Sequence, residues 1–234
     1  MSEPLASIVV CTIDGYLPRL RRLVVGVLRH TVVEYELIVV DGATTDGTAA
    51  WLASMPRVHV VRLATKPTAA IGANAGFSVA KGRYVTKLDT DTVVRGDGWL
   101  RGAIRALECD PNAGVAGDIW CVGSGGTAAL KAGREDTSRL ASRWWDETPT
   151  RANLPHCQGG AMVFVGAVLR KIGGINERYQ HSFDDVEMSW VLLSRGWKLI
   201  CAPRFCCCDT ADRLARRVQP SHIVIHPVKE APCE

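Results

Sequence analysis

The chain lacks any long hydrophobic run, and its N-terminal apolar stretch, residues 8–11, is too short for a secretion signal or a membrane span. We therefore expect a cytoplasmic protein without a transmembrane segment. Internal repeats, coiled-coil heptads and low-complexity linkers are missing as well. With 234 residues, 47% of them hydrophobic and 22% charged, the composition is that of one ordinary globular domain.

Cysteine is present, but in a pattern that argues against a disulfide framework. The nine cysteines are an odd number in a chain that is not small, and several stand inside strand-like runs. No Cys-x-x-Cys pair occurs, and neighbouring thiols of the triplet at 206–208 would point to opposite faces of an extended chain. The sequence therefore predicts reduced thiols and no structural zinc.

Hydrophobic periodicity alternates between strands and helices, which is typical of βαβ units and a parallel sheet. We expect a single α/β domain over 1–234, in which a mixed, mostly parallel sheet is flanked by helices. Its parts are 1–95, 96–205 and a C-terminal tail, 206–234. The predicted strands are 8–11, 36–40, 58–63, 84–88, 114–122 and 161–165, and the predicted helices are 17–28, 48–55, 68–80, 97–109, 167–172 and 184–194. Residues 123–156 show no periodicity and predict a long irregular segment.

Polar side chains stand where the first strands end. Because right-handed crossovers bring the carboxyl ends of parallel strands to one edge of a sheet, we expect these side chains to cluster there. The residues concerned are Thr12, Asp14, Asp41, Asp46, Asp89 and Asp91.

The segment Asp89, Thr90, Asp91 is the strongest functional signal. Alternation along an extended chain puts both carboxylates on one side, where they can approach one divalent ion, or one ion and a ribose. Carboxylates this close repel each other unless a cation or hydrogen-bond donors intervene. Taken alone, the pair is equally compatible with a capped turn. Asp41 can accept from a base imide or a ribose hydroxyl, whereas Asp46 suits a helix cap.

Five segments in order and spacing resemble the inverting family 2 glycosyltransferases, which have the nucleotide-sugar-binding GT-A fold, a Rossmann-like domain. The resemblance covers roughly residues 5 to 200 and is far more specific than any single motif. The matching segments are SIVVCTIDG, VVDGATTDGT, GANAGFSVAKGRYVTKLDTDT, GGAMVFVGAVLRKIGGINERY and FDDVEMSWVLLSRGWKL.

The resemblance implies a role for each aspartate. Thr12, Asp14 and Asp41 would bind the nucleoside of the sugar donor, with the 1–95 part as the donor-binding half. Asp89 would contact the ribose and the metal, and Asp91 would hold Mn²⁺ or Mg²⁺ against the diphosphate. Thr90 belongs to the same donor site. Ala73 stands where many relatives have an arginine, and Lys87 or Lys66 is the substitute that the chain offers. His226, or alternatively His222, would complete the metal shell.

Asp184 and Asp185 precede an apolar helical pattern, so they lie at a helix N-terminus, where the dipole favours the ionised form. By the resemblance, Asp185 would be the general base that takes the proton of the acceptor hydroxyl. Asp184, where relatives usually carry glutamate, would either share that role or cap the helix.

The acceptor-binding and catalytic half is predicted as residues 96–205. Gly159 and Gly160 would let a substrate approach the backbone beside Gln158, and Trp144 and Trp145 would stack on a sugar or base. Basic residues gather in 131–151 and 213–217 and indicate either a solvated face or a grip on a polyanion. The acceptor would then be a saccharide, a peptide or a hydroxymethylated DNA base that is flipped out of the duplex.

Two other functions stay open. A sugar-nucleotide pyrophosphorylase shares the general architecture, but the segment CTIDGYLPRL lacks its glycine-rich phosphate loop. A non-catalytic nucleotide-sugar-binding module is the other alternative, and the presence of Asp89, Asp91 and Asp185 argues against it. The family favours a uridine diphosphate sugar as donor.

Overall fold

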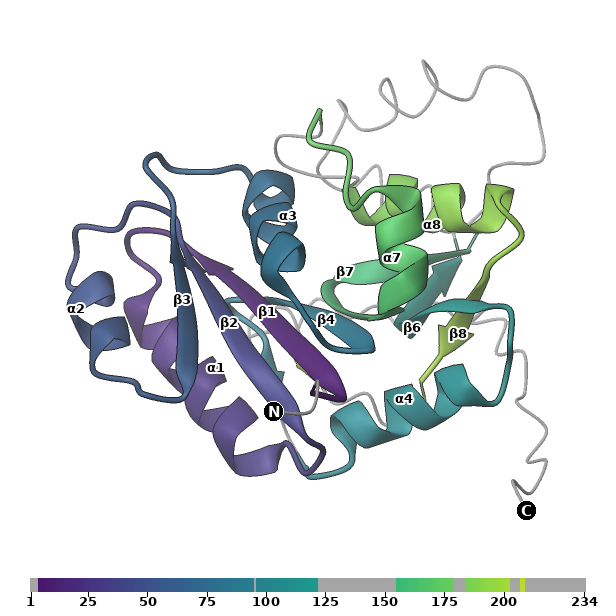
Figure 1. Ribbon diagram of the computed structural model, residues 1–234, viewed down its shortest axis with the longest axis horizontal. Coiled ribbons are helices and arrows are strands. Elements are labelled where there is room, and N and C mark those ends of the chain that lie inside the picture. Colours follow the sequence, from purple (N-terminus) through teal and green to yellow (C-terminus); the bar gives the residue numbers. More distant parts are fainter. Residues whose placement is uncertain (1–3, 95, 122–154, 179–183, 203–206, 209–234) are drawn as a thin grey trace.

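The computed structural model describes residues 4–94, 96–121, 155–178, 184–202 and 207–208, and Figure 1 shows how they are arranged. The strands are β1 (Ala6–Thr12), β2 (Tyr35–Asp41), β3 (Val58–Arg62), β4 (Tyr84–Asp89), β5 (Val93–Val94), β6 (Ala113–Cys121), β7 (Pro155–Val165), β8 (Lys198–Cys201) and β9 (Cys207–Cys208). The helices are α1 (Leu17–His30), α2 (Thr48–Ala53), α3 (Ala69–Val79), α4 (Trp99–Glu108), α7 (Gly166–Ile172) and α8 (Asp184–Ser194).

Seven strands form one sheet in the order β3-β2-β1-β4-β7-β6-β8. The neighbours β3, β2, β1 and β4 are parallel, β7 is antiparallel to both β4 and β6, and β8 is parallel to β6. Strand β7 therefore runs against the other strands of this sheet. The expected fold class, a mixed and mostly parallel sheet flanked by helices, is confirmed. Strands β5 and β9 pair separately.

The helices cover both faces of the sheet because successive side chains of a strand point to opposite faces. On β1, Ile8 and Val10 belong to the core beneath α1 and α4, whereas Val9 belongs to the core beneath α3, α7 and α8. Figure 1 shows the two helix layers on either side of the sheet. Helix α1 presents a buried stripe at helical spacing, and this stripe consists of Leu20, Leu23, Val24 and Val27.

Several predicted boundaries need correction. Strand β7 begins at Pro155, so the last two residues of the predicted irregular segment, 123–156, belong to a strand, and so do Gly159 and Gly160, for which no strand or helix was predicted. Residues on either side of the two glycines pair with neighbouring strands: 161–165 pair with β4, and 155–157 and 162–164 pair with β6, with a shift of register between them. This pairing overrides the weak strand propensity of glycine. The short strands β5, β8 and β9 were not predicted, because two to four residues carry too little periodicity to identify a strand.

Close backbone contacts fix the loops that follow β1 and β2. A Cβ at Gly42 would stand 2.6 Å from Pro67 Cδ and 2.8 Å from the Thr12 carbonyl oxygen, so only glycine fits there. The Gly42 N–H donates to that same oxygen at 2.9 Å. Thr68 caps α3, since its hydroxyl accepts from the Ile71 N–H at 3.2 Å. Among the helices that the structure describes, none combines the length and the apolarity that crossing a membrane requires.

Candidate functional site

A cavity of about 290 Å³ opens at the carboxyl ends of β1 and β4, beside the N-terminus of α3. Its walls combine apolar side chains with the acidic turn at the end of β4, which is formed by residues 89–92. The lining residues are Val9, Cys11, Ile13, Tyr16, Pro67, Thr68, Ala69, Ala73, Lys87, Leu88, Asp89, Thr90 and Asp91.

The acidic turn presents Asp89 and Asp91 to this cavity. The Thr90 hydroxyl donates to the Cys11 carbonyl oxygen at 2.7 Å, and the Thr92 hydroxyl donates to the Gly160 carbonyl oxygen at 2.8 Å. These two bonds tie the turn to β1 and to β7. The two aspartates are thereby held at one wall of the cavity, and the hydroxyls of Thr90 and Thr92 are bound to backbone carbonyl oxygens.

The donor set fits a hard divalent ion such as Mn²⁺ or Mg²⁺, which prefers carboxylate oxygens and completes its shell with phosphate and water. The side chain of Asp89 is 43% exposed, so its oxygens are accessible from the cavity. In the described part of the chain, no group of three His, Cys, Asp or Glu side chains forms a metal cage by itself. Asp89 and Asp91 would therefore supply the protein's ligands there, and a bound diphosphate would supply others.

Lys87 lies behind the turn, with 5% of its surface exposed. Its ammonium donates to Asp89 Oδ1 and to the Gly159 carbonyl oxygen, each at 2.7 Å. Burial alone would lower the pKa of Lys87, but the charge and hydrogen bond of Asp89, together with the charges of Asp184 and Asp185, raise that pKa above its usual value. Lys87 is therefore a permanent buried cation among carboxylates.

Asp185 meets β7 from the first turn of α8. Its Oδ2 accepts from the Gly159 N–H at 2.9 Å, and its Oδ1 accepts from the N–H of Val186 at 2.8 Å. A Cβ at Gly159 would lie 3.0 Å from Asp185 Cβ, so glycine allows the helix to approach the strand this closely. Gly159 thus contacts Asp185 through its N–H and Lys87 through its carbonyl oxygen.

Asp184 differs from the sequence expectation that the helix dipole favours the ionised form. Burial raises the pKa of Asp184, and the charges of Asp185 and Asp89 raise it further, while Lys87 opposes the shift. Desolvation of this partly buried carboxyl outweighs the effect of the helix dipole here. His156 is also influenced by Asp185. Burial lowers the pKa of His156, and the charge of Asp185 opposes that shift.

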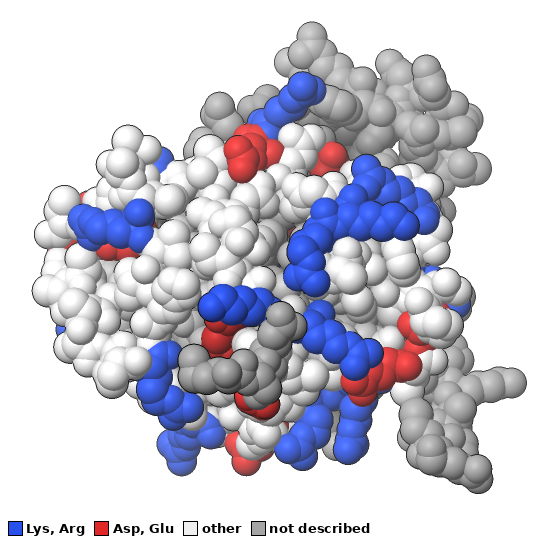
Figure 2. Space-filling view, viewed as in Figure 1, with Lys and Arg blue, Asp and Glu red and all other residues white. Residues whose placement is uncertain are grey.

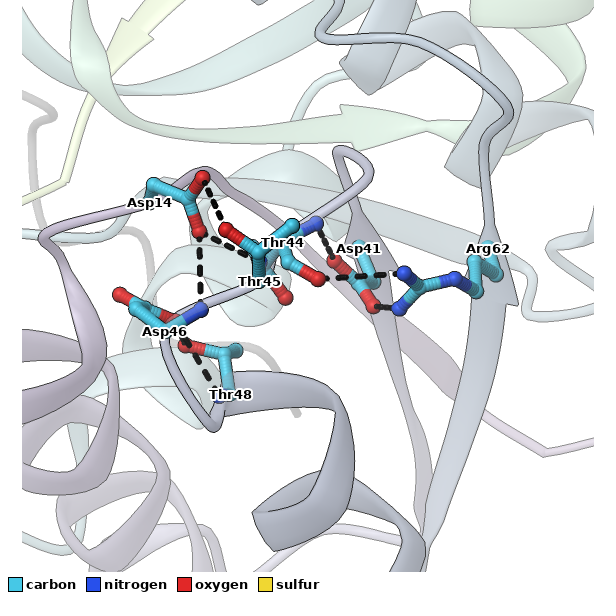
Figure 3. A network of polar contacts seen from close by, with 7 residues as sticks. All are labelled: Asp14, Asp41, Thr44, Thr45, Asp46, Thr48 and Arg62. Atoms are coloured by element: carbon cyan, nitrogen blue, oxygen red, sulfur yellow. Dashed lines mark hydrogen bonds and ion pairs between the residues drawn. The ribbon is translucent and has the colours of Figure 1, made fainter.

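A second polar network joins the loops that follow β1 and β2 (Figure 3). Asp14 accepts from the backbone N–H groups of Thr45 and Asp46 at 2.6 and 3.2 Å. Asp46 returns the contact by accepting from the Gly15 N–H at 2.7 Å, and it also accepts from the N–H and hydroxyl of Thr48 at the start of α2. The N-cap of α2 is Gly47 and not Asp46, but Asp46, one residue before it, still binds the first residue of the helix.

Asp41 is buried in this network, with 1% of its side chain exposed. One oxygen accepts from the Thr44 N–H at 2.9 Å, and the other pairs with the Arg62 guanidinium, which also donates to the Thr44 carbonyl oxygen at 3.1 Å. Both oxygens of Asp41 therefore have partners within the protein, and Arg62, whose side chain is 51% exposed, presents the outer surface of the pair.

The structure brings some of the predicted residues together at the cavity and places others away from it. Lys87, Asp89, Thr90 and Asp91 line the cavity, and Asp184 and Asp185 connect to it through Lys87 and Gly159. Thr12, Asp14 and Asp41 do not line it but support its rim, and Gln158 is half-buried on β7. Trp144, Trp145, His222 and His226 lie outside the described residues, as do the basic segments 131–151 and 213–217.

Basic side chains gather elsewhere on the described part of the molecule. Figure 2 shows them over α7, where Arg170 and Lys171 are exposed. Helix α7 begins beside the start of β4, because the Gly166 N–H donates to the Arg83 carbonyl oxygen at 2.8 Å. This basic surface therefore lies at the opposite end of β4 from Asp89.

Sequence reasoning missed Arg62, His156 and Thr92. Arg62 could have been found from strand register, since the last residues of two adjacent parallel strands are neighbours and Asp41 is paired with Arg62. His156 and Thr92 have no such signal, because their places depend on the unexpected length of β7 and on the turn after β4.

Comparison with known proteins agrees with this geometry. The family model described as "Glycosyl transferase family 2" matches residues 7–173. Over 73 residues, which are 30% of this chain and 24% of the relative, the sequence is 37% identical to glycosyltransferase GlyG of Streptococcus pneumoniae. It is 34% identical over 87 residues to the succinoglycan biosynthesis protein ExoO of Rhizobium meliloti, covering 36% and 25% of the two chains.

A third relative is the putative teichuronic acid biosynthesis glycosyltransferase TuaG of Bacillus subtilis, at 39% identity over 70 residues, or 28% of each chain. The matches thus span about a quarter of the length of these relatives. Among solved structures, a mannosyltransferase from Pyrobaculum calidifontis in complex with GDP-Man and Mn²⁺ superposes with a TM-score of 0.64 at 21% identity, covering 88% of this chain and 57% of that one. This likeness shows that the two chains share the GT-A fold.

Proposed function

Because the chain belongs to glycosyl transferase family 2, we propose that it is a metal-dependent inverting glycosyltransferase that moves a sugar from a nucleoside diphosphate sugar to an acceptor hydroxyl. One observation carries the proposal. A cavity with two accessible carboxylates, Asp89 and Asp91, is connected through Lys87 and Gly159 to a further carboxylate, Asp185. A donor site and a proton acceptor are thus joined by direct contacts.

In this mechanism, Asp185 accepts the proton of the acceptor hydroxyl as its oxygen attacks the anomeric carbon. A bond forms between that oxygen and the carbon, and the bond from the carbon to the diphosphate oxygen breaks on the opposite face, so the configuration inverts. Asp89 and Asp91 would hold the divalent ion, which supplies positive charge for the departing diphosphate. The N–H groups of Gly159 and Val186 fix both oxygens of Asp185 and so orient its carboxylate.

The apolar part of the cavity supports a role in holding the donor. Cys11, Ile13 and Pro67 form a wall next to Asp89, and this wall excludes water from one side of a bound diphosphate sugar. Ala73 leaves the wall uncharged where many relatives carry arginine. Lys87, which also lines the cavity, supplies a positive charge next to Asp89, and its ammonium is bound to Asp89 and to the Gly159 carbonyl oxygen.

The donor and the acceptor are proposed from the family and from the named relatives. The family favours a uridine diphosphate sugar, and GDP-mannose is the second donor to test because the mannosyltransferase with the same fold was solved with it. Two relatives are named for the biosynthesis of succinoglycan and of teichuronic acid, which favours a saccharide acceptor over a peptide or a modified DNA base.

Calorimetric titration of the nucleoside diphosphate with and without Mn²⁺ tests the metal and donor assignment. We expect wild-type protein to bind UDP or GDP more tightly with Mn²⁺, and the variant Asp91→Asn to lose this gain while keeping its melting temperature. Asp97→Asn is a matched control, since Asp97 is exposed and pairs with His30 away from the cavity. Full-strength binding by Asp91→Asn that is insensitive to a chelator would refute the assignment.

A further inference from the structure

Lys87 occupies a position that the proposed chemistry does not itself require. The family-type roles need Asp89 and Asp91 for the donor and Asp185 for the proton, whereas Lys87 lines the cavity with an ammonium that is already bound to two protein oxygens. Enclosing an ammonium group costs several kcal/mol in general unless good partners compensate. A lysine with 5% of its surface exposed, placed between the carboxylate of Asp89 and the backbone of Gly159, therefore calls for an explanation.

The contacts of Lys87 join two elements that are far apart in the sequence. From β4, its ammonium reaches Asp89 Oδ1, and across the sheet it reaches the Gly159 carbonyl oxygen on β7. The same residue of β7 donates its N–H to Asp185 Oδ2 on α8. A continuous chain of three hydrogen bonds of 2.7 to 2.9 Å thus runs from the donor carboxylate to the base.

We propose that Lys87 is a positioning residue that fixes the separation of Asp89 and Asp185, and that its hold on Asp89 weakens the binding of a divalent ion when no donor is present. The proposal rests on the proposed function for the roles of Asp89 and Asp185. Lys87 acts through its contacts with Asp89 and with Gly159, which binds Asp185.

The second half of the proposal follows from charge and geometry. A divalent ion at Asp89 competes with the Lys87 ammonium for Oδ1, which accepts from Nζ at 2.7 Å. The ammonium also repels the ion, because the two positive charges share one carboxylate. Removing the lysine charge should therefore tighten the binding of Mn²⁺ alone, even though the active geometry is lost. A residue with a purely structural role would not produce these opposite effects.

The variant Lys87→Met keeps an unbranched side chain that is one atom shorter, and it removes the charge and the hydrogen-bond donors. We expect turnover to fall about 10²-fold, because losing the Gly159 contact displaces Asp185 from its productive position. We expect the dissociation constant of Mn²⁺ alone, measured by calorimetry without donor, to decrease about ten-fold. Lys198→Met is the matched control: its Nζ also pairs with an aspartate at 2.7 Å, but on the exposed surface at Asp110, and it should change neither quantity.

The variant Lys87→Arg separates charge from geometry. It retains the positive charge, so Mn²⁺ affinity should stay near the wild-type value, while the larger planar head group cannot reproduce both short contacts and turnover should still fall. Wild-type turnover in Lys87→Met would overturn the proposal, as would reduced turnover without tighter binding of Mn²⁺. If Lys87→Met and Lys87→Arg both fail to fold, Lys87 serves the stability of the fold and the proposal is also overturned.

These outcomes are distinct from a failure of the proposed function. A wild-type protein that consumes no nucleotide sugar would refute the proposed transferase activity, whereas the Mn²⁺ titration of Lys87→Met can be read without turnover. A wild-type enzyme that is active, with variants that bind Mn²⁺ alike, would refute only the role of Lys87.

Discussion

Two adjacent glycines of β7 offer a matched test of how closely the base is placed. A methyl group at Gly159 would lie 3.0 Å from Asp185 Cβ and 3.1 Å from Asp185 Oδ2, whereas a methyl group at Gly160 would meet its nearest atom, Asp89 Oδ2, at 4.0 Å. Ordinary contact begins near 3.4 Å, so Gly159→Ala must push Asp185 back by a few tenths of an ångström. Gly160→Ala has room without such a shift.

A displacement of 1 Å in a positioned catalytic group costs roughly 10²-fold in rate, so the smaller shift in Gly159→Ala should lower turnover about ten-fold. The added methyl group should cost about 1 kcal/mol of stability, since it lies at a helix end that can retreat. Donor hydrolysis without acceptor is the assay, because it requires the base but leaves the acceptor side out. Melting temperatures of both variants provide the control for folding.

The Michaelis constant for the donor separates the base from the donor site. We expect Gly159→Ala to change turnover and leave this constant near its wild-type value, because the donor carboxylates do not touch the added methyl group. Equal losses in Gly159→Ala and Gly160→Ala would refute the reasoning, and so would a fully active Gly159→Ala. Either result would show that the Gly159 contact does not set the position of Asp185.

Three further predictions concern single side chains. Asp185→Asn should lower turnover by about 10² to 10⁴-fold with little effect on donor affinity, and a larger loss in Asp184→Asn would move the base one residue back. Arg62→Leu should destabilise the fold by roughly 1–2 kcal/mol in denaturant titration, because it strips the buried Asp41 of its counter-charge, and a double variant with Asp41→Asn should recover most of that loss. Because the pKa of His156 is depressed in the folded state, its neutral form stabilises the protein above about pH 6.5, and that stability is lost as the pH falls. His156→Gln should therefore flatten the loss of melting temperature between about pH 7 and 5, while the exposed His59→Gln should leave it unchanged.

The first part of the fold was predictable because each of its elements is long enough to show a period. The short apolar run of β1 and the apolar stripe of α1 can each be recognised from the local spacing of their apolar residues. Strand β7 was predicted too short, since Gly159 and Gly160 interrupt its pattern and its residues are held by neighbours on both sides. Pairing partners that lie far away in sequence cannot be read from a local window.

The candidate site, like the fold, could be predicted only in part from the sequence. The place of Asp89 and Asp91 could be predicted because they stand where a buried strand ends, and both of them line the cavity at that edge of the sheet. The contact between Lys87 and Gly159 could not be predicted, because it depends on the antiparallel register that sets Lys87 opposite Met162. The pKa of Asp184 was misjudged for a related reason: the helix dipole can be read from sequence, but the burial that outweighs it cannot.

The most direct test of the central claim is the product formed from a nucleotide sugar. Purified protein is incubated with UDP-glucose, and separately with GDP-mannose, in the presence of Mn²⁺ and without acceptor, and the products are resolved by ion-exchange chromatography. We predict slow, chelator-sensitive release of the nucleoside diphosphate and free sugar, with no effect of added pyrophosphate. Formation of a nucleoside triphosphate and a sugar 1-phosphate that depends on pyrophosphate would instead identify a pyrophosphorylase. Binding without any turnover, in the presence of a broad panel of donors and acceptors, would identify a non-catalytic binding module and contradict the account.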